Sequence, residues 1–200
     1  PKFDRIEPYE LSEYMILDAA TRKNLELVET LREKNKYGSL LWAIDRTKTN
    51  MGARLLKSWI CQPLKNLSEI MARQNSVSEL VQNEDVRFAL GEYLEKIYDI
   101  QRLSTRMSNG SASPKDFVDI KLSLNLLPKL FDITENLEYD MFASVREYRE
   151  QMEDYATMIE NTIVDEPPIQ LKEGGIIKEG VSGELDYFRD LLTGGEEWLK

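Results

Sequence analysis

The sequence predicts a mainly α-helical, multi-helical fold with one short β-hairpin near the C-terminal end. Apolar residues recur at intervals of three and four from Leu40 to Ile163, which is the period of a helix with one buried face. Glycine and proline are scarce, at 10 and 7 of 200 residues, which disfavours disorder and a loop-rich all-β design. Charged residues make up 31% of the chain, and this excess suits long helices with solvated faces.

The first part of the chain carries no helical period. Pro1 and Pro8 bracket a short polar run, so we expect residues 1–14 to be the end of a preceding connector segment. Residues 14–17 are apolar and predict either a short strand or a buried turn. Residues 25–28 alternate between apolar and polar side chains, which permits another short strand.

Two helices are expected after this region. Residues 40–44 form a first short apolar face, residues 51–60 form a second, and Pro63 ends that helix. Trp59 follows Leu55 on the same face of the second helix. We therefore predict that both side chains are structural core residues.

The middle of the chain predicts two further helices. Asn66 followed by Glu69 is typical of a helix N-terminus, and the helix that they begin has apolar side chains up to Val81. A new helix is expected from Asn83, because an apolar period then continues for about six turns to Met107.

The clearest helix start of the chain follows a glycine turn. Asn109-Gly110 suits a positive φ and ends the preceding helix. Ser113 then has the character of an N-cap, with Pro114 in the first helical position and Asp116 in the third. Apolar residues continue this helix to Leu127, and Pro128 is expected to break or kink it.

The last third of the chain changes character twice. Apolar residues spaced four and three apart from Met141 to Thr162 form a narrow seam like that of a coiled coil. Pro167-Pro168 ends that helix, and residues 169–177 predict two short strands around a Gly174-Gly175 turn.

A helix is expected to resume near Leu185, and Gly194-Gly195 is expected to interrupt it. Residues 196–200 then begin one more helical turn. Because so short a helix is unstable alone, we expect the chain to be cut inside a longer helix.

Composition argues against a catalytic centre in this chain. Histidine, the commonest general base and metal ligand, is absent, and Cys61 is the single cysteine. No phosphate-binding loop occurs, and Gly174-Gly175 lacks the lysine and the following helix of such a loop. We therefore expect no cofactor and no metal here. The lack of a signal peptide and of a long apolar run predicts a soluble, cytoplasmic chain without membrane contact.

The net charge of −10 makes DNA binding by this chain alone unfavourable. Arg102, Arg106 and Lys115, near the Asn109-Gly110 turn, are the candidates for a phosphate contact, although pairing of the two arginines with nearby acids is favoured. Residues 45–48 form a polar junction that indicates a capped turn between helices, with a binding role as the alternative.

Several of these runs together resemble the MutS family of DNA mismatch-repair proteins. The most specific piece is residues 38–49 followed by residues 51–56, and Trp59 and Pro63-Leu64 continue it. Three further pieces follow the family's order along the chain: residues 15–27, residues 110–116, and residues 166–168 and 173–177 with Leu185. One departure is Ser111, where the family often has an arginine, so a charge contact from that turn is in doubt.

The resemblance implies a division of the chain. Residues 15–165 would form the helical core or lever, and residues 166–200 the hairpin and the beginning of a truncated helical clamp that grips DNA. The family's mismatch-reading Phe-x-Glu and its P-loop are both absent here. The implied role is therefore mechanical, in that the lever links the clamp to the ATPase.

Partners follow from the same resemblance. They are the rest of the same polypeptide, a homodimer partner, duplex DNA held by the full clamp and a downstream mismatch-repair protein. ATP and magnesium are implied for the full-length protein only, and a bacterial cytoplasm with use at the nucleoid is the implied location. The alternatives are an autonomous DNA-binding module without catalysis and a small metal-dependent hydrolase built from clustered carboxylates.

Overall fold

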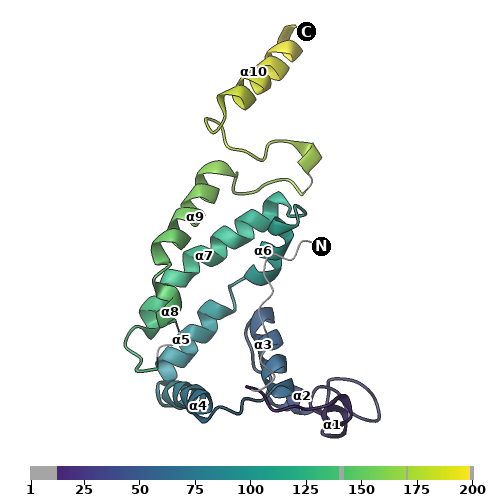
Figure 1. Cartoon of the computed structure of the whole chain (residues 1–200). Coiled ribbons are helices and arrows are strands. Elements are labelled where there is room, and N and C mark those ends of the chain that lie inside the picture. The colour runs from purple at the N-terminus through teal and green to yellow at the C-terminus, as the bar shows by residue number, and fades with distance from the viewer. Residues whose placement is uncertain (1–12, 140–141, 170, 199–200) are drawn as a thin grey trace. The chain divides into compact units, whose positions relative to one another are not determined.

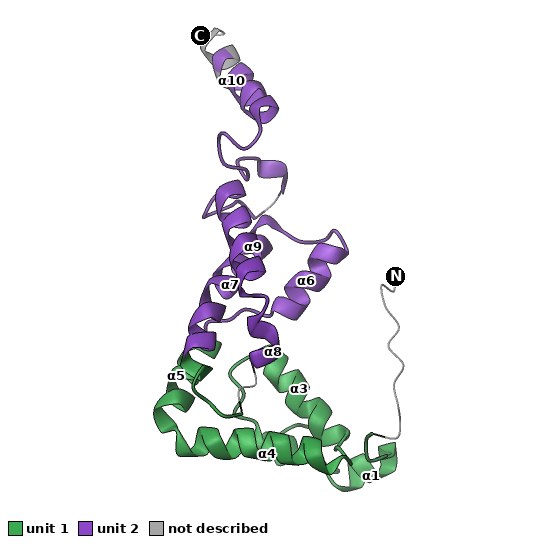
Figure 2. Ribbon diagram, turned by 60° about the vertical axis from the view of Figure 1, so that its left-hand side comes forward, with its two compact units in different colours: residues 1–95, 133–141 green, residues 96–132, 142–200 purple. Residues whose placement is uncertain are grey.

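The computed structural model describes residues 13–139, 142–169 and 171–198, and its regular elements are helices (Figure 1). These residues divide into two compact units (Figure 2). Unit 1 contains residues 1–95 and 133–141, and unit 2 contains residues 96–132 and 142–200. The mainly α-helical prediction is confirmed. Pro1, Pro8 and the chain end at Lys200 lie outside the described residues.

Unit 1 is built from five short to medium helices. They are α1 (Ala19–Asn24), α2 (Leu40–Ile44), α3 (Asn50–Cys61), α4 (Leu67–Gln82) and α5 (Glu84–Leu94). Side chains begin the first four, because Asp18, Ser39, Thr49 and Asn66 each accept a hydrogen bond from a backbone N–H in the first turn. The predicted N-cap at Asn66 is confirmed.

The expected strand at residues 25–28 is wrong. This segment is the turn that leaves α1, and Glu26 has a positive φ of 48°. The backbone carbonyls of this segment accept hydrogen bonds from the start of α2, because Leu40 N–H donates to Glu26 O and Leu41 N–H donates to Leu27 O. Residues 14–17 form no strand either, and only an isolated bridge pairs Tyr14 with Leu64.

The core of unit 1 is thin, with Leu27, Leu41, Leu64 and Leu90 as its buried apolar side chains among the described residues. The prediction that Leu55 and Trp59 belong to it is wrong, because they are 52% and 39% exposed. Leu56 and Ile60, which follow them along α3, are half-buried. Each follows its exposed neighbour by one residue, and one residue turns a helix by about 100°. The apolar stripe of α3 is therefore wider than the face that this chain covers.

Unit 2 contains α6 (Ile100–Ser108), most of α7 (Pro114–Thr134), α8 (Ala143–Arg146), α9 (Arg149–Thr162), the 3₁₀ helix η1 (Leu171–Glu173) and α10 (Gly183–Trp198). The helix expected from Asn83 to Met107 is divided into α5 and α6, and Asp99 caps α6 by accepting from Arg102 N–H. Helix α5 ends at Leu94, and Asp99 caps a new helix inside the same apolar period, which periodicity alone does not show.

Helix α7 begins as predicted. Asp116 accepts from the backbone N–H of Ser113, and Ser113 Oγ accepts from Asp116 N–H, which is a reciprocal capping box behind a buried Pro114. Gly110 has the expected positive φ of 67°. Pro128 does not break the helix, which continues to Thr134.

The predicted seam is divided between α8 and α9, and Met141 lies outside the described residues. Tyr148 and Tyr155 are exposed, whereas Ala156 and Ile163 are buried. The covered face of α9 is thus displaced by about one residue from the predicted one.

The β-hairpin around Gly174-Gly175 is also wrong for the described residues. Both glycines have positive φ, as a turn requires, but η1 precedes them and no strand follows. Residues 176 and 178 bond instead to the exit of α9, through Val164 N–H to Ile176 O and Lys178 N–H to Thr162 O. These hydrogen bonds to the exit of α9 use the backbone groups that a hairpin would need. Gly194-Gly195 does not interrupt α10, which runs through both residues.

Candidate functional site

Two of the three candidate DNA-contacting residues are paired with acids. Arg106 Nη2 lies 2.8 Å from Asp116 Oδ1, and Asp116 is only 5% exposed. Arg102 Nε lies 3.7 Å from Asp99 Oδ2. Pairing of both arginines with nearby acids is confirmed. Arg106 therefore compensates the buried carboxylate that caps α7, and its contact with DNA stays a prediction.

Lys115, the third candidate, is exposed in the first turn of α7. Burial raises the pKa of Asp119, and the positive charge of Lys115 acts against this shift. The structure thus brings Arg106 and Lys115 to the start of one helix, beside acids rather than on an uninterrupted basic face.

The junction at residues 45–48 is a capped turn, as expected. Asp45 Oδ1 accepts from the N–H and the hydroxyl of Thr47, at 3.1 and 2.7 Å, and Asp45 Oδ2 lies 2.5 Å from Lys36 Nζ. The hydrogen bond from Lys36, followed by those from Thr47, lowers the pKa of Asp45 to about 2. These bonds already occupy both carboxylate oxygens, so the turn has a local structural role.

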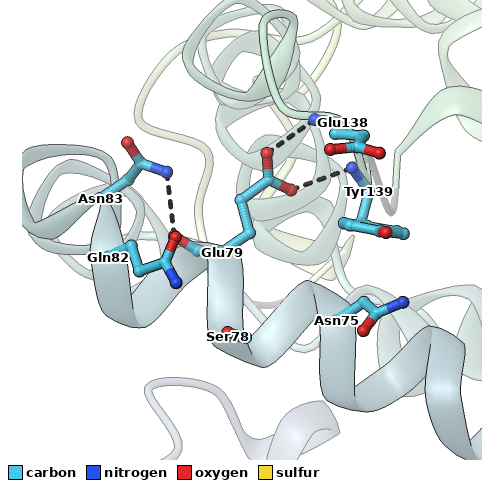
Figure 3. Close-up of a pocket in the computed structure, with 7 residues that line it drawn as sticks. All are labelled: Asn75, Ser78, Glu79, Gln82, Asn83, Glu138 and Tyr139. Carbon is cyan, nitrogen blue, oxygen red and sulfur yellow. Dashed lines mark hydrogen bonds between the residues drawn. The ribbon is translucent and has the colours of Figure 1, made fainter.

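A polar hollow of about 300 Å³ lies in unit 1, lined by Asn75, Ser78, Glu79, Gln82, Asn83, Glu138 and Tyr139 (Figure 3). Glu79 reaches across it and accepts from the backbone N–H groups of Glu138 at 2.7 Å and Tyr139 at 2.9 Å. Both carboxylate oxygens of Glu79 are thus used to hold this loop. The hollow therefore lies where Glu79 of α4 holds the loop of residues 138–139, which is a structural role.

The feature of unit 2 that suits a mechanical role is a buried cation between α7 and the exit of α9. The side chain of Lys121 is 7% exposed, and its Nζ lies 2.5 Å from Glu160 Oε2 and 3.0 Å from Asp165 Oδ1. Lys178 Nζ lies 3.5 Å from the other oxygen of Glu160. One buried ammonium therefore fixes the end of α9 and the residues beyond it.

The charges of this cluster shift one another's titration. The hydrogen bond to Glu160 raises the pKa of Lys121, and that from Lys121 lowers the pKa of both Glu160 and Asp165. All three groups are therefore charged across the neutral range.

A second ion pair fixes the orientation of α9 against α7. Arg149, at the start of α9, pairs with Asp132 near the end of α7 at 3.1 Å, while Glu160 near the end of α9 pairs with Lys121 in the first half of α7. The two helices therefore lie antiparallel and side by side (Figure 1).

The same contacts continue to α10. The bridge between Ile163 and Ile177 carries the chain past the end of α9. Arg189 of α10 then donates through Nη2 to Ile177 O at 2.7 Å, and its Nη1 lies 3.0 Å from Asp186. Asp186 in turn accepts from Gly180 N–H. We call Lys121, Glu160, Asp165, Lys178 and Arg189 the joint, because they connect α7 through the exit of α9 to α10.

Sequence reasoning missed the joint, although one signal was present. Lys121 stands four residues after Phe117 and three before Leu124, inside the apolar stripe of α7. A lysine in a buried stripe requires acid partners, but sequence alone did not indicate that Glu160 and Asp165 supply them.

Among the described residues, no group of three or more Asp, Glu, Cys or His side chains could hold a metal ion. Gly174 and Gly175 follow η1 and do not open a helix, so they do not form a phosphate cradle. Cys61 is a half-buried free thiol. No described helix has the length and apolar character to cross a membrane.

Comparison with known proteins identifies the family. A family model described as MutS domain III matches residues 20–196. The chain belongs to the MutS domain III family. The match includes all five residues of the joint.

Curated MutS relatives agree with this assignment. The DNA mismatch repair protein MutS of Lachnoclostridium phytofermentans is 45% identical over 194 residues, which is 97% of this chain and 21% of that protein. MutS of Acetivibrio thermocellus is 45% identical over 96% of the chain and 22% of its own length, and MutS of Ruminiclostridium cellulolyticum is 43% identical over 98% and 22%. The chain thus spans about a fifth of the length of the MutS relatives that it matches.

Proposed function

We propose that this MutS domain III chain is the lever of a DNA mismatch-repair protein, and that it transmits movement between a DNA-gripping clamp and an ATPase. In this proposal residues 15–165 are the lever and residues 166–200 begin the clamp. The observation that carries the proposal is the joint. It ties α10 to α7 by one buried ammonium and a short run of polar contacts.

Ion pairs suit this role because they fix geometry more sharply than apolar contacts do. An ammonium with two carboxylates is satisfied in few arrangements, whereas an apolar face can slide. A rigid joint transmits a displacement of α10 to α7, and a loose one absorbs it. Coupling in the working protein requires an element with two states that both ends bias.

We further propose the family's wider activity for the whole protein: mismatched-DNA binding, ATP hydrolysis with magnesium, a homodimer, a downstream repair partner and a cytoplasmic location. No group of three or more acidic, histidine or cysteine side chains among the described residues could hold a metal ion, and we propose that ATP and magnesium bind in other parts of the whole protein. We therefore assign the chain no catalytic step. In this proposal the chain holds the clamp and transmits its movement to the ATPase.

The test is a chimera in which this chain replaces the matching segment of Lachnoclostridium phytofermentans MutS, which is 45% identical. ATPase activity and mismatched-duplex binding are first measured separately. ATPase activity is then measured in the presence of the duplex, which gives the effect of DNA on the ATPase. We expect Lys121→Met to leave basal ATPase and DNA binding within about twofold, but to reduce the effect of DNA on the ATPase by about fivefold or more.

Lys129→Met is the matched control, because Lys129 is an exposed lysine on the same helix. The proposal is refuted if Lys121→Met and Lys129→Met leave the same coupling, or if Lys121→Met abolishes one activity outright while the protein stays folded.

A further inference from the structure

A short segment of the chain that runs from α9 to α10 contacts both helices (Figure 1). Residues 176–178 are half-buried, whereas the residues on either side, 171–175 and 179–181, are exposed. The segment and both helices belong to unit 2. We call residues 176–178 the strap, and its attachments to the two helices differ in strength.

The attachment of the strap to the exit of α9 is small. It consists of two backbone hydrogen bonds, of 3.0 and 2.9 Å, on either side of the isolated bridge between Ile163 and Ile177. Lys178 adds an ion pair with Glu160 at 3.5 Å, and the side chain of Glu160 is 47% exposed. A two-stranded pairing of this kind is marginal in water, and an exposed ion pair contributes little. Release of the strap from α9 therefore costs little free energy.

The attachment of the strap to α10 is stronger, because charged side chains make it. Arg189 Nη2 donates to Ile177 O at 2.7 Å, and Asp186 accepts from Gly180 N–H at 2.8 Å. The two side chains are themselves paired at 3.0 Å. Hydrogen bonds with one ionised partner are roughly twice as strong as those between neutral groups. The strap and the start of α10 are therefore expected to move as one body.

Glycines lie on both sides of the strap, but they are held differently. Gly174 and Gly175 have positive φ angles of 72° and 67°, and a side chain added at either would meet no described atom within 4 Å. The bond from Gly174 N–H to Leu171 O is long, at 3.4 Å. Gly180 also has a positive φ, of 83°, but Asp186 holds its N–H. A hinge is therefore expected at Gly174-Gly175, because glycine changes its backbone angles at the least steric cost.

We propose that the strap is a two-state latch, which detaches from the exit of α9 and moves away with α10 about the Gly174-Gly175 hinge. The bound state is the one that the structure describes, and the released state is a minor population. Detachment divides the joint, because the part around Lys121 stays with α7 and α9 while Lys178 and Arg189 leave with α10. Such an element with two states is what coupling between a clamp and an ATPase requires. That consequence rests on the proposed lever function, whereas detachment itself is a property of this chain.

Amide hydrogen exchange in the 200-residue chain, resolved by nuclear magnetic resonance, tests the detachment. The N–H groups of Val164 and Lys178 bond across the bridge, and Ile163 N–H, which bonds to Ile159 O in the last turn of α9, is the internal reference. We expect Val164 and Lys178 to share one opening free energy and to exchange at least about tenfold faster than Ile163, after correction for intrinsic rates. Exchange of the two amides as slow as that of Ile163, or with unequal opening free energies, would overturn the proposal.

Variants show which contacts break when the strap opens. Lys178→Met removes a contact between the strap and α9, so it should raise the exchange rate of Val164 N–H by about threefold. Arg189→Met removes a contact that both states keep, so it should leave this rate unchanged. Lys172→Met, at an exposed lysine before the strap, is the matched control. An equal rise in Arg189→Met and Lys178→Met would mean that the strap leaves α10 as well, which contradicts the proposal.

The two glycine turns test the position of the hinge. Gly174→Ala strains the positive φ of the bound state, so it should favour release and raise the exchange rate of Val164 N–H by about tenfold. Gly180→Ala introduces the same strain, but both states keep this turn, so the rate should not change. The reverse result would place the hinge beside α10 and would refute the latch. Circular dichroism of each variant checks that the fold is retained.

A disulfide across the bridge tests the latch in the whole protein. Ile163 and Ile177 form the non-hydrogen-bonded pair of the bridge, a geometry in which Cα atoms lie about 4.5 Å apart and a disulfide is possible. In the chimera with Lachnoclostridium phytofermentans MutS, Ile163→Cys with Ile177→Cys should reduce the effect of DNA on the ATPase by about fivefold or more when oxidised. Reduction should restore the effect. The chimera without this cysteine pair, given the same treatments, is the control.

The two experiments separate the latch from the lever proposal. If exchange shows no detachment, the latch is overturned, and the comparison of Lys121→Met with Lys129→Met still decides the lever. If the strap detaches but the oxidised chimera keeps its full response to DNA, the role of the latch in coupling is refuted. Detachment together with a response that is lost on oxidation and regained on reduction supports both.

Discussion

Removal of Lys121 and removal of its acid partners should destabilise the chain by different amounts. The ammonium is buried, with its side chain 7% exposed, whereas the side chains of Glu160 and Asp165 are 47% and 68% exposed. In Lys121→Met the two carboxylates return to water at little cost. In Glu160→Ala with Asp165→Ala the buried ammonium loses both acceptors.

The magnitudes follow from this asymmetry. Lys121→Met keeps the packed stem and loses two ion pairs with half-exposed partners, each contributing about 0.5–1 kcal/mol, so we expect a loss of about 1–2 kcal/mol. The double acid variant leaves the ammonium of Lys121 without either acceptor, so we expect a larger loss than in Lys121→Met. The triple variant, without either charge, should be more stable than the double variant.

The assay is urea unfolding of the four proteins, followed by circular dichroism at neutral pH, with Lys129→Met as the exposed-lysine control. Equal losses for Lys121→Met and the double acid variant would refute the reasoning, because they would mean that the ammonium is solvated. A triple variant less stable than the double variant would refute it as well.

Three further predictions concern other positions. Ser113→Ala removes the hydroxyl that caps α7 and should lower the free energy of unfolding by about 1 kcal/mol in urea titrations, and an unchanged midpoint would contradict the capping role. Trp59→Ala should lower it by less than about 3 kcal/mol, because the side chain is 39% exposed and stacks against Arg73, and a larger loss would place Trp59 in the core. Asp45 has a pKa lowered from 3.8 to about 2, so its stabilising effect is complete above pH 4 and is lost as the pH falls towards 2. Asp45→Asn should therefore flatten the acid limb of the stability curve between these values, and an unaltered acid limb in thermal unfolding would count against the Lys36 contact.

The helix starts that a local signal defines could be predicted from the sequence. Asn66 and the Ser113-Pro114-Asp116 start depend on side chains that bond within one turn, so no distant residue decides them. The thin core could not be predicted in the same way. The face of α3 with Leu55 and Trp59 has the correct period for burial, but burial also needs a covering element, and periodicity does not say whether one is present.

Non-local pairing explains the remaining differences. The local sequence around Gly174-Gly175 favours a hairpin, yet residues 176 and 178 bond to the exit of α9, more than ten residues earlier. The joint has the same origin, since Lys121 and Glu160 are 39 residues apart in the sequence. Patterns in a single sequence describe residues that are neighbours along the chain. They do not indicate which of several distant residues with the same charge or polarity becomes the partner.

The central claim, that the joint holds α10 to α7, is tested most directly by a distance measurement between the two helices. Spin labels are placed at Asn125→Cys on α7 and Glu184→Cys on α10, both exposed positions, with Cys61→Ser removing the native thiol. Pulsed electron resonance should give one narrow distance distribution that becomes broad or bimodal in Lys121→Met and stays narrow in Lys129→Met. A distribution of the same width in all three proteins would contradict the claim.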